Sequence, residues 1–248
     1  MQPKLTETDL ARGLAQLGVQ PGMALEVHCS LRAFGHVSGG ADAVIAALLQ
    51  AVTPSGAIVM PAFRISPNLP LTDEDRRLGL TAKIRILSDS ERPTAMGIVA
   101  DTFRMRPDVV TGDGLFRTSA WGTNSAIHAT GFQHLIDHGG YALLCGVDIY
   151  RLSAMHYVED ALPPEIRARF TPSAEAKRIY PESQWLIEAW EPELKPWYAI
   201  QQQAYDKGLI TDARIGNAKC MLFPVRPVIE LYRQALLTRP FSLYGLES

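Results

Sequence analysis

The chain has 248 residues, of which 47% are hydrophobic and 20% charged, and its formal net charge is −2. This composition is typical of a folded globular protein, and the slightly acidic balance argues against a nucleic-acid partner. Three dispersed cysteines without a CxxC pair, and the lack of an apolar run of about 18 residues, indicate a cytoplasmic protein with reduced thiols and no membrane partner.

The first third of the chain predicts an α/β unit. An amphipathic helix over residues 6–18 precedes a strand at 23–31, a helix at 39–52 and a second strand at 56–63. That order favours strands joined by a crossover helix. Residues 66–94 are polar and irregular, and a segment of this length without regular structure is usually a functional cover or a disordered stretch.

The remainder of the chain predicts helices over 94–107 and 123–130, and a third buried strand over 141–147. Another helix begins near residue 153 and stops before Pro163. Residues 165–198 are rich in Pro, Trp and Glu, and we expect them to meander over the core, with a short strand pair at most. Helices at 197–210 and 227–240 flank one strand near 213–225.

The first candidate site is HCSLRAFGHVSGG, residues 28–40, where a strand leads through a short loop and glycines into a helix. Backbone N–H groups at such a helix start can hold a phosphate or a carbonyl oxygen, and Arg32 could pair with a phosphate. The spacing matches neither a P-loop nor GxGxxG, so a plain strand–helix turn with His28 in the core remains open.

The second candidate site is YRLSAMHYVED, residues 150–160. In a helix His156 and Glu159 share a face, and a carboxylate on one imidazole nitrogen raises the basicity of the other. The pair fits a base that deprotonates an amine, a hydroxyl or a water. An ordinary helix start with acids in its first turn explains the same residues equally well, and a single HxxE is a weak metal signal.

The third candidate site is GDGLFRTSAWGTNSAIH, residues 112–128. It gathers Arg117, Thr118, Ser119 and Trp121 in a glycine-rich, polar stretch. The segment either contacts a ligand or forms a turn before the helix predicted at 123–130.

The order of these segments resembles the aminoglycoside 3-N-acetyltransferase family over most of the chain. The family's Val-His-Ser-Ser-Leu strand, its Gly-Gly and the following Met-Pro strand correspond to 27–63; the Pro-Ser-x-Met-Gly segment corresponds to RPTAMG at 92–97. LLCGVDIYRLSAMHYVED, 143–160, is similar to a Leu-Leu-Gly-Val strand followed by His-x-x-Glu, and GLITDARIGNAK, 208–219, resembles the C-terminal Gly-x-x-Gly-x-Ala strand.

Several positions depart from the family pattern. Cys29 stands where serine is usual, Tyr150 where an acid is common, and Leu152 where asparagine is common. The family's His-Pro loop is replaced by TGDGLFRTSAWG at 111–122. These changes affect the expected acceptor more than the expected acetyl-CoA chemistry.

The resemblance implies an α/β fold of the α/β/α type, a mixed sheet sandwiched by helices, with an irregular C-terminal extension. We expect one acetyl-CoA-dependent N-acetyltransferase domain over 1–248, with 66–94 and 165–198 as covering insertions. The family's catalytic roles fall on His156 as general base and Glu159 as its orienting carboxylate. Contacts to acetyl-CoA fall on Cys29, Ser30, Leu31, Arg32, Phe34 and Ser119, and contacts to the acceptor on Phe63, Asp113, Arg117 and Tyr150.

The reaction expected is direct transfer of an acetyl group to an amine of a small molecule, the 3-amino group of an aminoglycoside antibiotic. Backbone N–H groups near residues 30–32, or Ser119, would steady the oxyanion. Transfer to another biosynthetic amine or amino sugar, a non-catalytic CoA-binding relative, and a metal hydrolase using His28, His156 and Glu159 remain alternatives. We expect no metal, and a monomer or homodimer.

Overall fold

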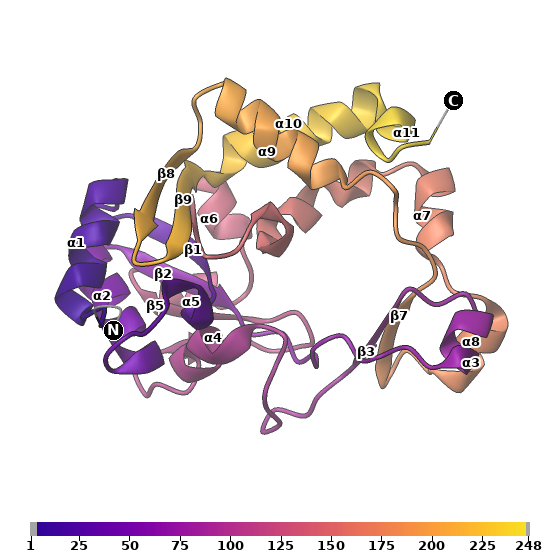
Figure 1. Cartoon of the computed structure of the whole chain (residues 1–248), viewed down its shortest axis with the longest axis horizontal. Coiled ribbons are helices and arrows are strands. Elements are labelled where there is room, and N and C mark those ends of the chain that lie inside the picture. The colour runs from indigo at the N-terminus through magenta and orange to yellow at the C-terminus, as the bar shows by residue number, and fades with distance from the viewer. Residues whose placement is uncertain (1–3, 247–248) are drawn as a thin grey trace.

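A seven-stranded mixed sheet forms the centre of the protein in this computed structural model, which describes residues 4–246 (Figure 1). The strands run in the order β4-β5-β2-β1-β6-β9-β8; the neighbouring pairs β2–β1 and β1–β6 are parallel, and the other neighbouring pairs are antiparallel. Their bounds are β1 Ala24–Cys29, β2 Ala57–Pro61, β4 Val110–Thr111, β5 Thr118–Gly122, β6 Tyr141–Cys145, β8 Thr211–Ile215 and β9 Ala218–Pro224.

One face of the sheet is covered by α1 (Glu7–Leu17), α2 (Gly40–Val52) and α4 (Gly97–Phe103), whose buried side chains share one apolar core with the strands. The first helix forms where its local signals place it. Thr6 and Asp9 make a reciprocal capping box at its start, and Gly18 closes its end in a left-handed conformation with φ of 110°. The predicted helix at 6–18 is thereby confirmed.

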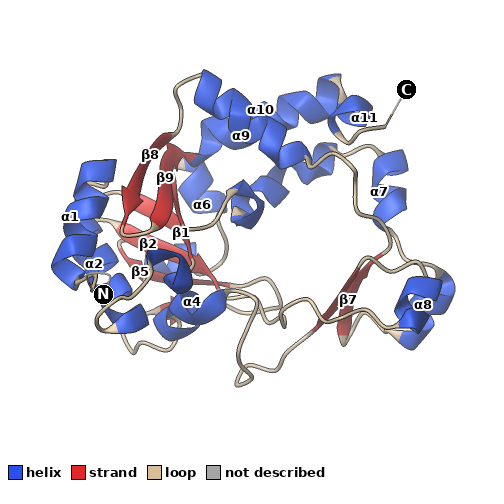
Figure 2. Cartoon of the chain, viewed as in Figure 1, coloured by secondary structure: helices blue, strands red, loops and turns tan. Residues whose placement is uncertain are grey.

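The opposite face is covered by α6 (Gln133–Asp137), α9 (Pro196–Asp206) and α10 (Val225–Thr238), together with the 3₁₀ helices η2 (Ile149–Arg151) and η3 (Ser153–Ala161) (Figure 2). Side chains alternate along β1, so Leu25 and Val27 enter the core beneath α1 and α2. Glu26 and His28 point to the other face, where they meet the start of η3.

A second, two-stranded sheet pairs β3 (Ala82–Arg85) with β7 (Trp185–Glu188) at the far end of the molecule (Figure 1). The helices α3 (Asp73–Arg77), α7 (Pro164–Phe170) and α8 (Ala174–Ile179) belong to the same two segments of chain. Asp75 anchors this lobe, because its fully buried carboxylate is paired with the Lys83 ammonium and accepts the Tyr180 hydroxyl at 2.5 Å. The two segments predicted as insertions are therefore joined to each other.

The structure differs from the sequence-based expectation at several elements. Residues 118–122, for which the sequence left a ligand contact or a turn open, form strand β5, and the helix predicted at 123–130 shortens to α5 (Ser125–His128). The single strand predicted near 213–225 is a hairpin of β8 and β9, because Gly216 turns the chain with φ of 57°. A further helix, α11 (Pro240–Leu243), follows α10.

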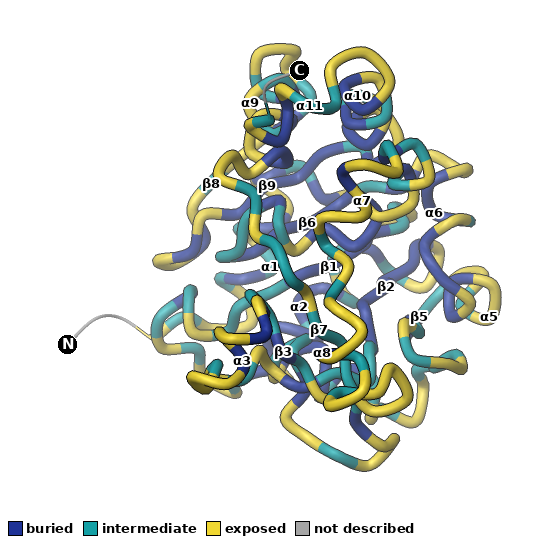
Figure 3. Tube along the Cα trace, turned by 90° about the vertical axis from the view of Figure 1, so that its right-hand side faces the viewer, coloured by how far each residue is buried: buried dark blue, intermediate teal, exposed yellow. Residues whose placement is uncertain are grey.

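Buried stretches occupy the interior of the molecule and exposed stretches form its outer loops (Figure 3). The predicted fold class, a mixed sheet with helices on both faces, is confirmed. Among residues 4–246, no helix combines the length and the apolar character needed to cross a bilayer.

Candidate active site

The candidate site lies at the carboxyl ends of the parallel strands. The 3₁₀ helix η1 (Leu31–Phe34) follows β1, and η2 and η3 follow the neighbouring strand β6. In the sheet, β2 lies on one side of β1 and β6 lies on the other. The helix α2, which follows β1, covers one face of the sheet, and α6, which precedes β6, covers the opposite face. In open α/β sheets, ligands bind in the crevice at such a reversal of strand order.

His156 and Glu159 lie on η3, which is a 3₁₀ helix rather than the α-helix that the spacing predicts. A 3₁₀ helix has three residues per turn, so side chains three positions apart stack directly above one another. The imidazole Nδ1 of His156 lies 2.7 Å from Oε2 of Glu159. This contact fixes the proton on Nδ1 and leaves Nε2 as the nitrogen available to accept another.

The surroundings of His156 favour its protonated form overall. Desolvation by the protein lowers the pKa of His156, but the hydrogen bond to Glu159 and the charges of Glu159, Glu188 and Glu26 outweigh it. The pKa is therefore raised above the ordinary value for histidine. The side chain keeps 61% of its surface exposed, so the imidazole is both basic and accessible.

Glu159 is also contacted by Tyr232, which in turn contacts Tyr244. The Tyr232 hydroxyl lies 3.4 Å from Oε1 of Glu159 and 2.7 Å from the Tyr244 hydroxyl. Burial raises the pKa of Tyr232, and burial raises the pKa of Tyr244 to about 12, so both phenols stay neutral. The carboxylate thus lies between an imidazole and a phenol that are both placed by packed helices.

A cavity of about 460 Å³ opens in front of His156. Its walls come from η2, η3, α7 and α9, from Tyr244 just after α11, and from residues of the lobe formed by β3 and β7. Glu159, Glu188 and Glu191 contribute carboxylates, and Lys195 contributes the one ammonium among the lining residues that the structure describes. Aromatic side chains complete the wall: Tyr150, Phe170, Trp190, Trp197 and Tyr244.

Tyr150, predicted to contact the acceptor, lines this cavity together with the predicted catalytic pair. Its ring stacks on Trp197 at a centroid distance of 5.1 Å, and its hydroxyl accepts the Trp197 backbone N–H at 3.1 Å. The Trp197 ring in turn meets the edge of the His156 ring at 5.0 Å. Trp197 therefore contacts the imidazole directly, and Tyr150 supports it through Trp197.

The residues predicted to contact acetyl-CoA divide between two environments. Ser30 and Arg32 lie at the carboxyl end of β1, and Arg32 is exposed without an ion pair to any residue that the structure describes. The side chains of Cys29, Leu31 and Phe34 instead join the apolar core beneath α1 and α2. Because side chains alternate along a strand, Cys29 points away from the face that carries His28.

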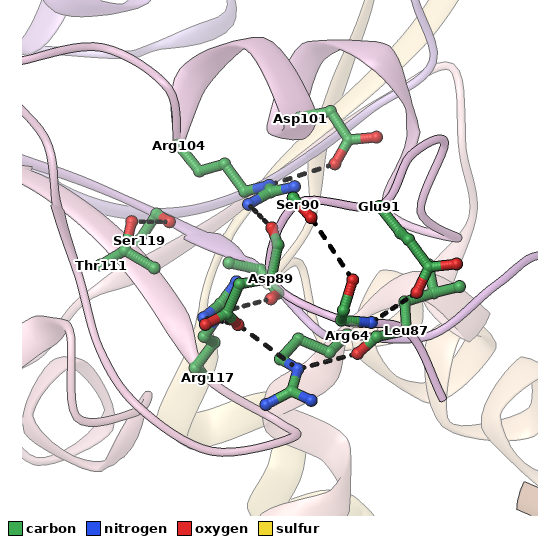
Figure 4. Close-up of polar contacts among 12 residues, drawn as sticks. Arg64, Leu87, Asp89, Ser90, Glu91, Asp101, Arg104, Thr111, Arg117 and Ser119 are labelled. Atoms are coloured by element: carbon green, nitrogen blue, oxygen red, sulfur yellow. Dashed lines mark hydrogen bonds and ion pairs between the residues drawn. The ribbon is translucent and has the colours of Figure 1, made fainter. Parts of the chain in front are cut away.

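Arg117 and Ser119 are engaged within the protein (Figure 4). The Arg117 guanidinium donates to the Asp89 carboxylate at 2.8 Å and to the Ala62 carbonyl at 3.2 Å. Ser119 is fully buried and shares a 2.7 Å hydrogen bond with Thr111, which leaves no hydroxyl free to steady an oxyanion. Arg64 also reaches Asp89, at 3.4 Å, so this cluster ties the 87–91 loop to the sheet.

Phe63 and Asp113, the other predicted acceptor residues, do not line the cavity. The Phe63 ring packs edge-to-face on the exposed Phe116 at 5.3 Å, and Asp113 is exposed on the turn before β5. Of the residues predicted for the site, the cavity brings together His156, Glu159 and Tyr150.

Sequence reasoning missed Trp197, Tyr232, Tyr244 and Glu26 as neighbours of the base. The Pro-, Trp- and Glu-rich composition of 165–198 indicates a cover over the core, and this segment supplies Glu188 and Glu191 to the cavity. No local pattern connects Tyr232 or Glu26 with His156, because each approaches from an element remote in sequence.

Comparison with known proteins agrees with this geometry. A sequence profile described as Aminoglycoside 3-N-acetyltransferase matches residues 27–237. The chain belongs to the aminoglycoside 3-N-acetyltransferase family. It is 27% identical to the SPbeta prophage-derived aminoglycoside N(3')-acetyltransferase-like protein YokD of Bacillus subtilis (strain 168), over 91% of this chain and 90% of that protein.

Solved structures of the family share the fold. Aminoglycoside acetyltransferase AAC(3)-IVa in complex with gentamicin superposes with a TM-score of 0.74, over 100% of this chain and 96% of that chain, at 21% identity. AAC-IIIb bound to CoASH superposes with a TM-score of 0.66, over 96% and 98%, at 18% identity. Membership of the aminoglycoside 3-N-acetyltransferase family confirms the predicted enzyme class, an acetyl-CoA-dependent N-acetyltransferase, and acetyl-CoA as its co-substrate.

Proposed function

We propose that this protein acetylates the 3-amino group of an aminoglycoside and that His156 is the general base. The main support is the position of His156. Its Nδ1 lies 2.7 Å from Oε2 of Glu159, and its ring lines a cavity that carries several carboxylates, so Nε2 is left to accept a proton there. A base needs an accessible nitrogen, a fixed tautomer and a pKa near the working pH. His156 meets the first two conditions, and the raised direction of its pKa suits the third.

In the proposed reaction the neutral acceptor amine attacks the carbonyl carbon of the acetyl thioester. A C–N bond forms, and His156 Nε2 accepts a proton from the nitrogen as positive charge develops there. The resulting imidazolium is stabilised by Glu159. The C–S bond then breaks, and the proton passes to the sulfur of the departing CoA. No covalent intermediate on the protein is required, and the side chain of Cys29 faces the apolar core rather than this site.

Acetyl-CoA would approach along the carboxyl end of β1. The backbone N–H groups of Leu31 and Arg32 begin η1 and would face the oxyanion, while the exposed Arg32 guanidinium would pair with a phosphate. This position lies beside η3, because the Ser153 N–H approaches the ring of His28 from β1 at 3.4 Å.

The charge of the cavity supports a cationic acceptor. Three carboxylates against one ammonium line it, and flat aromatic side chains offer surfaces on which sugar rings and cations pack. Desolvation raises the pKa of Glu188, and the charge of His156 lowers it by a smaller amount. A cationic amine that enters the cavity would therefore gain a partly desolvated carboxylate as its partner.

Replacing His156 by alanine tests the base. We expect the rate of CoA thiol release with an aminoglycoside such as gentamicin to fall by about 100-fold or more, the usual contribution of general-base catalysis. His36→Ala is the matched control, because His36 is exposed on a loop at another surface of the protein. Unchanged turnover in His156→Ala would refute the base assignment.

An acceptor panel tests the substrate independently. Aminoglycosides, simple amino sugars and small aliphatic amines are compared at equal concentrations with the wild-type protein. Turnover restricted to a small amine would overturn the aminoglycoside assignment while leaving the acetyl-transfer chemistry intact. Analysis of the product by NMR establishes whether the 3-amino group is the one acetylated.

A further inference from the structure

Glu26 is a fully buried carboxylate in the middle of β1, at the centre of the sheet. Charged side chains are almost never fully buried unless they are paired. Its neighbours on the strand, Leu25 and Val27, are ordinary core residues beneath α1 and α2. Glu26 instead faces η3, the helix that carries His156.

The carboxylate contacts the first turn of η3. Oε1 of Glu26 accepts the backbone N–H of Ala154 at 3.2 Å, and Ala154 is the second residue of the helix. This is the N–H that an N-cap side chain ordinarily binds. The residue in the N-cap position is Leu152, whose apolar side chain makes no capping hydrogen bond. The residues next to η3 provide no capping side chain, and Glu26 of strand β1 takes that place.

His28 fixes the carboxylate in this position. Its Nε2 lies 2.8 Å from Oε1 of Glu26, and the Ser153 N–H approaches the same nitrogen at 3.4 Å. One ring nitrogen cannot both donate to Glu26 and accept from Ser153 at the same time. The shorter contact assigns a proton to Nε2, so His28 donates to the carboxylate and Glu26 is the acceptor for the helix.

Stability alone does not explain this arrangement. Oε2 of Glu26 is buried without any hydrogen-bond partner among the residues that the structure describes. Burying such an atom without a partner is unfavourable, and replacing a whole buried ionic cluster by apolar side chains is often neutral or stabilising. A costly group retained beneath the base points to a role in the reaction.

We propose that Glu26, oriented by His28, is the N-terminal cap of η3, supplied by strand β1 of the same chain, and that this cap positions His156 for acetyl transfer. The inference rests on the proposed role of His156. Glu26 touches neither substrate in this arrangement, so it is a positioning residue. Its carboxylate sets where the first turn of η3 begins, and His156 lies in the following turn.

The test compares Glu26→Leu with Glu26→Gln. Leucine removes the acceptor for the Ala154 N–H, whereas the glutamine carbonyl can still accept it. We expect kcat to fall by about 10-fold or more in Glu26→Leu, because small misplacements of a catalytic group have effects of this order. The KM for acetyl-CoA should stay within about two-fold of wild type, and Glu26→Gln should keep at least about a third of wild-type kcat.

Two further measurements separate positioning from general stability. Thermal unfolding should show a lower Tm for Glu26→Leu, because the Ala154 N–H and the His28 ring N–H lose their buried acceptor, and a Tm closer to wild type for Glu26→Gln. Thr6→Ala removes the cap of α1, far from the site, and serves as the matched control: it should lower Tm and leave kcat unchanged. Amide hydrogen exchange at residues 153–156 should accelerate in Glu26→Leu and remain close to wild type in Glu26→Gln.

Wild-type kcat in Glu26→Leu overturns the proposal. Parallel losses of Tm and kcat in both Glu26 variants overturn it also, because they indicate a structural role alone. If His156→Ala retains activity, the base assignment fails, but hydrogen exchange still tests whether Glu26 caps η3. Unchanged exchange at residues 153–156 in Glu26→Leu would show that Glu26 does not hold the start of η3.

Discussion

Replacing Glu159 by glutamine isolates the charge behind His156 from its geometry. The glutamine carbonyl can still accept the Nδ1–H of His156, so the tautomer is preserved while the negative charge is lost. The carboxylate raises the pKa of His156 through its hydrogen bond and its charge. We therefore expect the acidic limb of the pH–rate profile to move to lower pH and the rate at its plateau to fall.

The size of the fall follows from the contact. A hydrogen bond to a charged group contributes about 1.5–3 kcal/mol, and the lower end applies here because 29% of the Glu159 side chain and 61% of the His156 side chain are exposed. About 1.4 kcal/mol corresponds to tenfold in rate. The plateau kcat of Glu159→Gln should thus be roughly tenfold below wild type, and Glu159→Ala, which also frees the tautomer, lower still.

The assay is thiol release from acetyl-CoA at saturating acceptor, followed across the range of about pH 5 to 8 in which histidine titrates. The sign is fixed by the base, which acts only when neutral. Activity rises as pH passes upward through its pKa, and a lower pKa moves that rise to lower pH. An acidic limb that stays in place, or moves to higher pH, would refute the assignment of His156 and Glu159 as base and partner.

Three further predictions address other parts of the molecule. Glu188→Gln removes one cavity carboxylate, so the KM for a cationic acceptor should rise by up to about five-fold while the KM for acetyl-CoA is unchanged. Steady-state kinetics with both substrates checks this prediction. A rise in the KM for acetyl-CoA instead would count against the cavity as the acceptor site. Tyr232→Phe removes a hydroxyl that contacts both Glu159 and Tyr244. It should lower kcat by about two- to ten-fold, the range for an ordinary hydrogen bond, because the 3.4 Å contact with the Glu159 carboxylate is too long for a strong charge-assisted one. An unchanged kcat would show that Tyr232 does not support the base. Asp75→Asn leaves the Lys83 ammonium without its buried partner and should reduce the free energy of unfolding, measured with denaturant, by about 3 kcal/mol. Desolvation raises the pKa of Asp75, but hydrogen bonds from Lys83, Tyr180 and Thr72 hold it well below its usual range. The stability from this group is therefore present above the unfolded pKa of about 4 and lost as the pH falls below it, so a mutational effect that persists unchanged in acid would contradict the ion pair.

The first third of the fold could be predicted from sequence because its signals are local. The capping box of Thr6 and Asp9 and the left-handed Gly18 define α1 without help from tertiary structure. The apolar runs of β1 and β2, separated by one helix, define a crossover. These elements form where their own residues place them.

Strand β5 could not be recognised because polar side chains occupy its buried positions. Thr118 and Ser119 are both fully buried. Because they are polar and stand among other polar residues, the sequence of this strand looks the same as that of an exposed turn. Their hydroxyls are satisfied by the His128 carbonyl at 2.6 Å and by Thr111 at 2.7 Å, partners that only the folded chain provides.

The site was predictable where its residues are close in sequence. His156 and Glu159 are three positions apart, and helical geometry alone brings them together. Glu26 and Tyr232 approach the same helix from β1 and α10, and a charged residue inside an apolar strand offers no sign of its partner. The 3₁₀ form of η3 likewise depends on what packs around it, because its spacing also suits an α-helix.

The pairing of β3 with β7 joins segments about a hundred residues apart. The wall that this lobe gives to the cavity rests on a sheet separate from the one that carries β1 and β6. The length of the lobe can therefore change without altering the register of the central sheet. Under the proposed function, the acceptor wall can thus vary while the strands that place His156 and Glu159 stay unchanged.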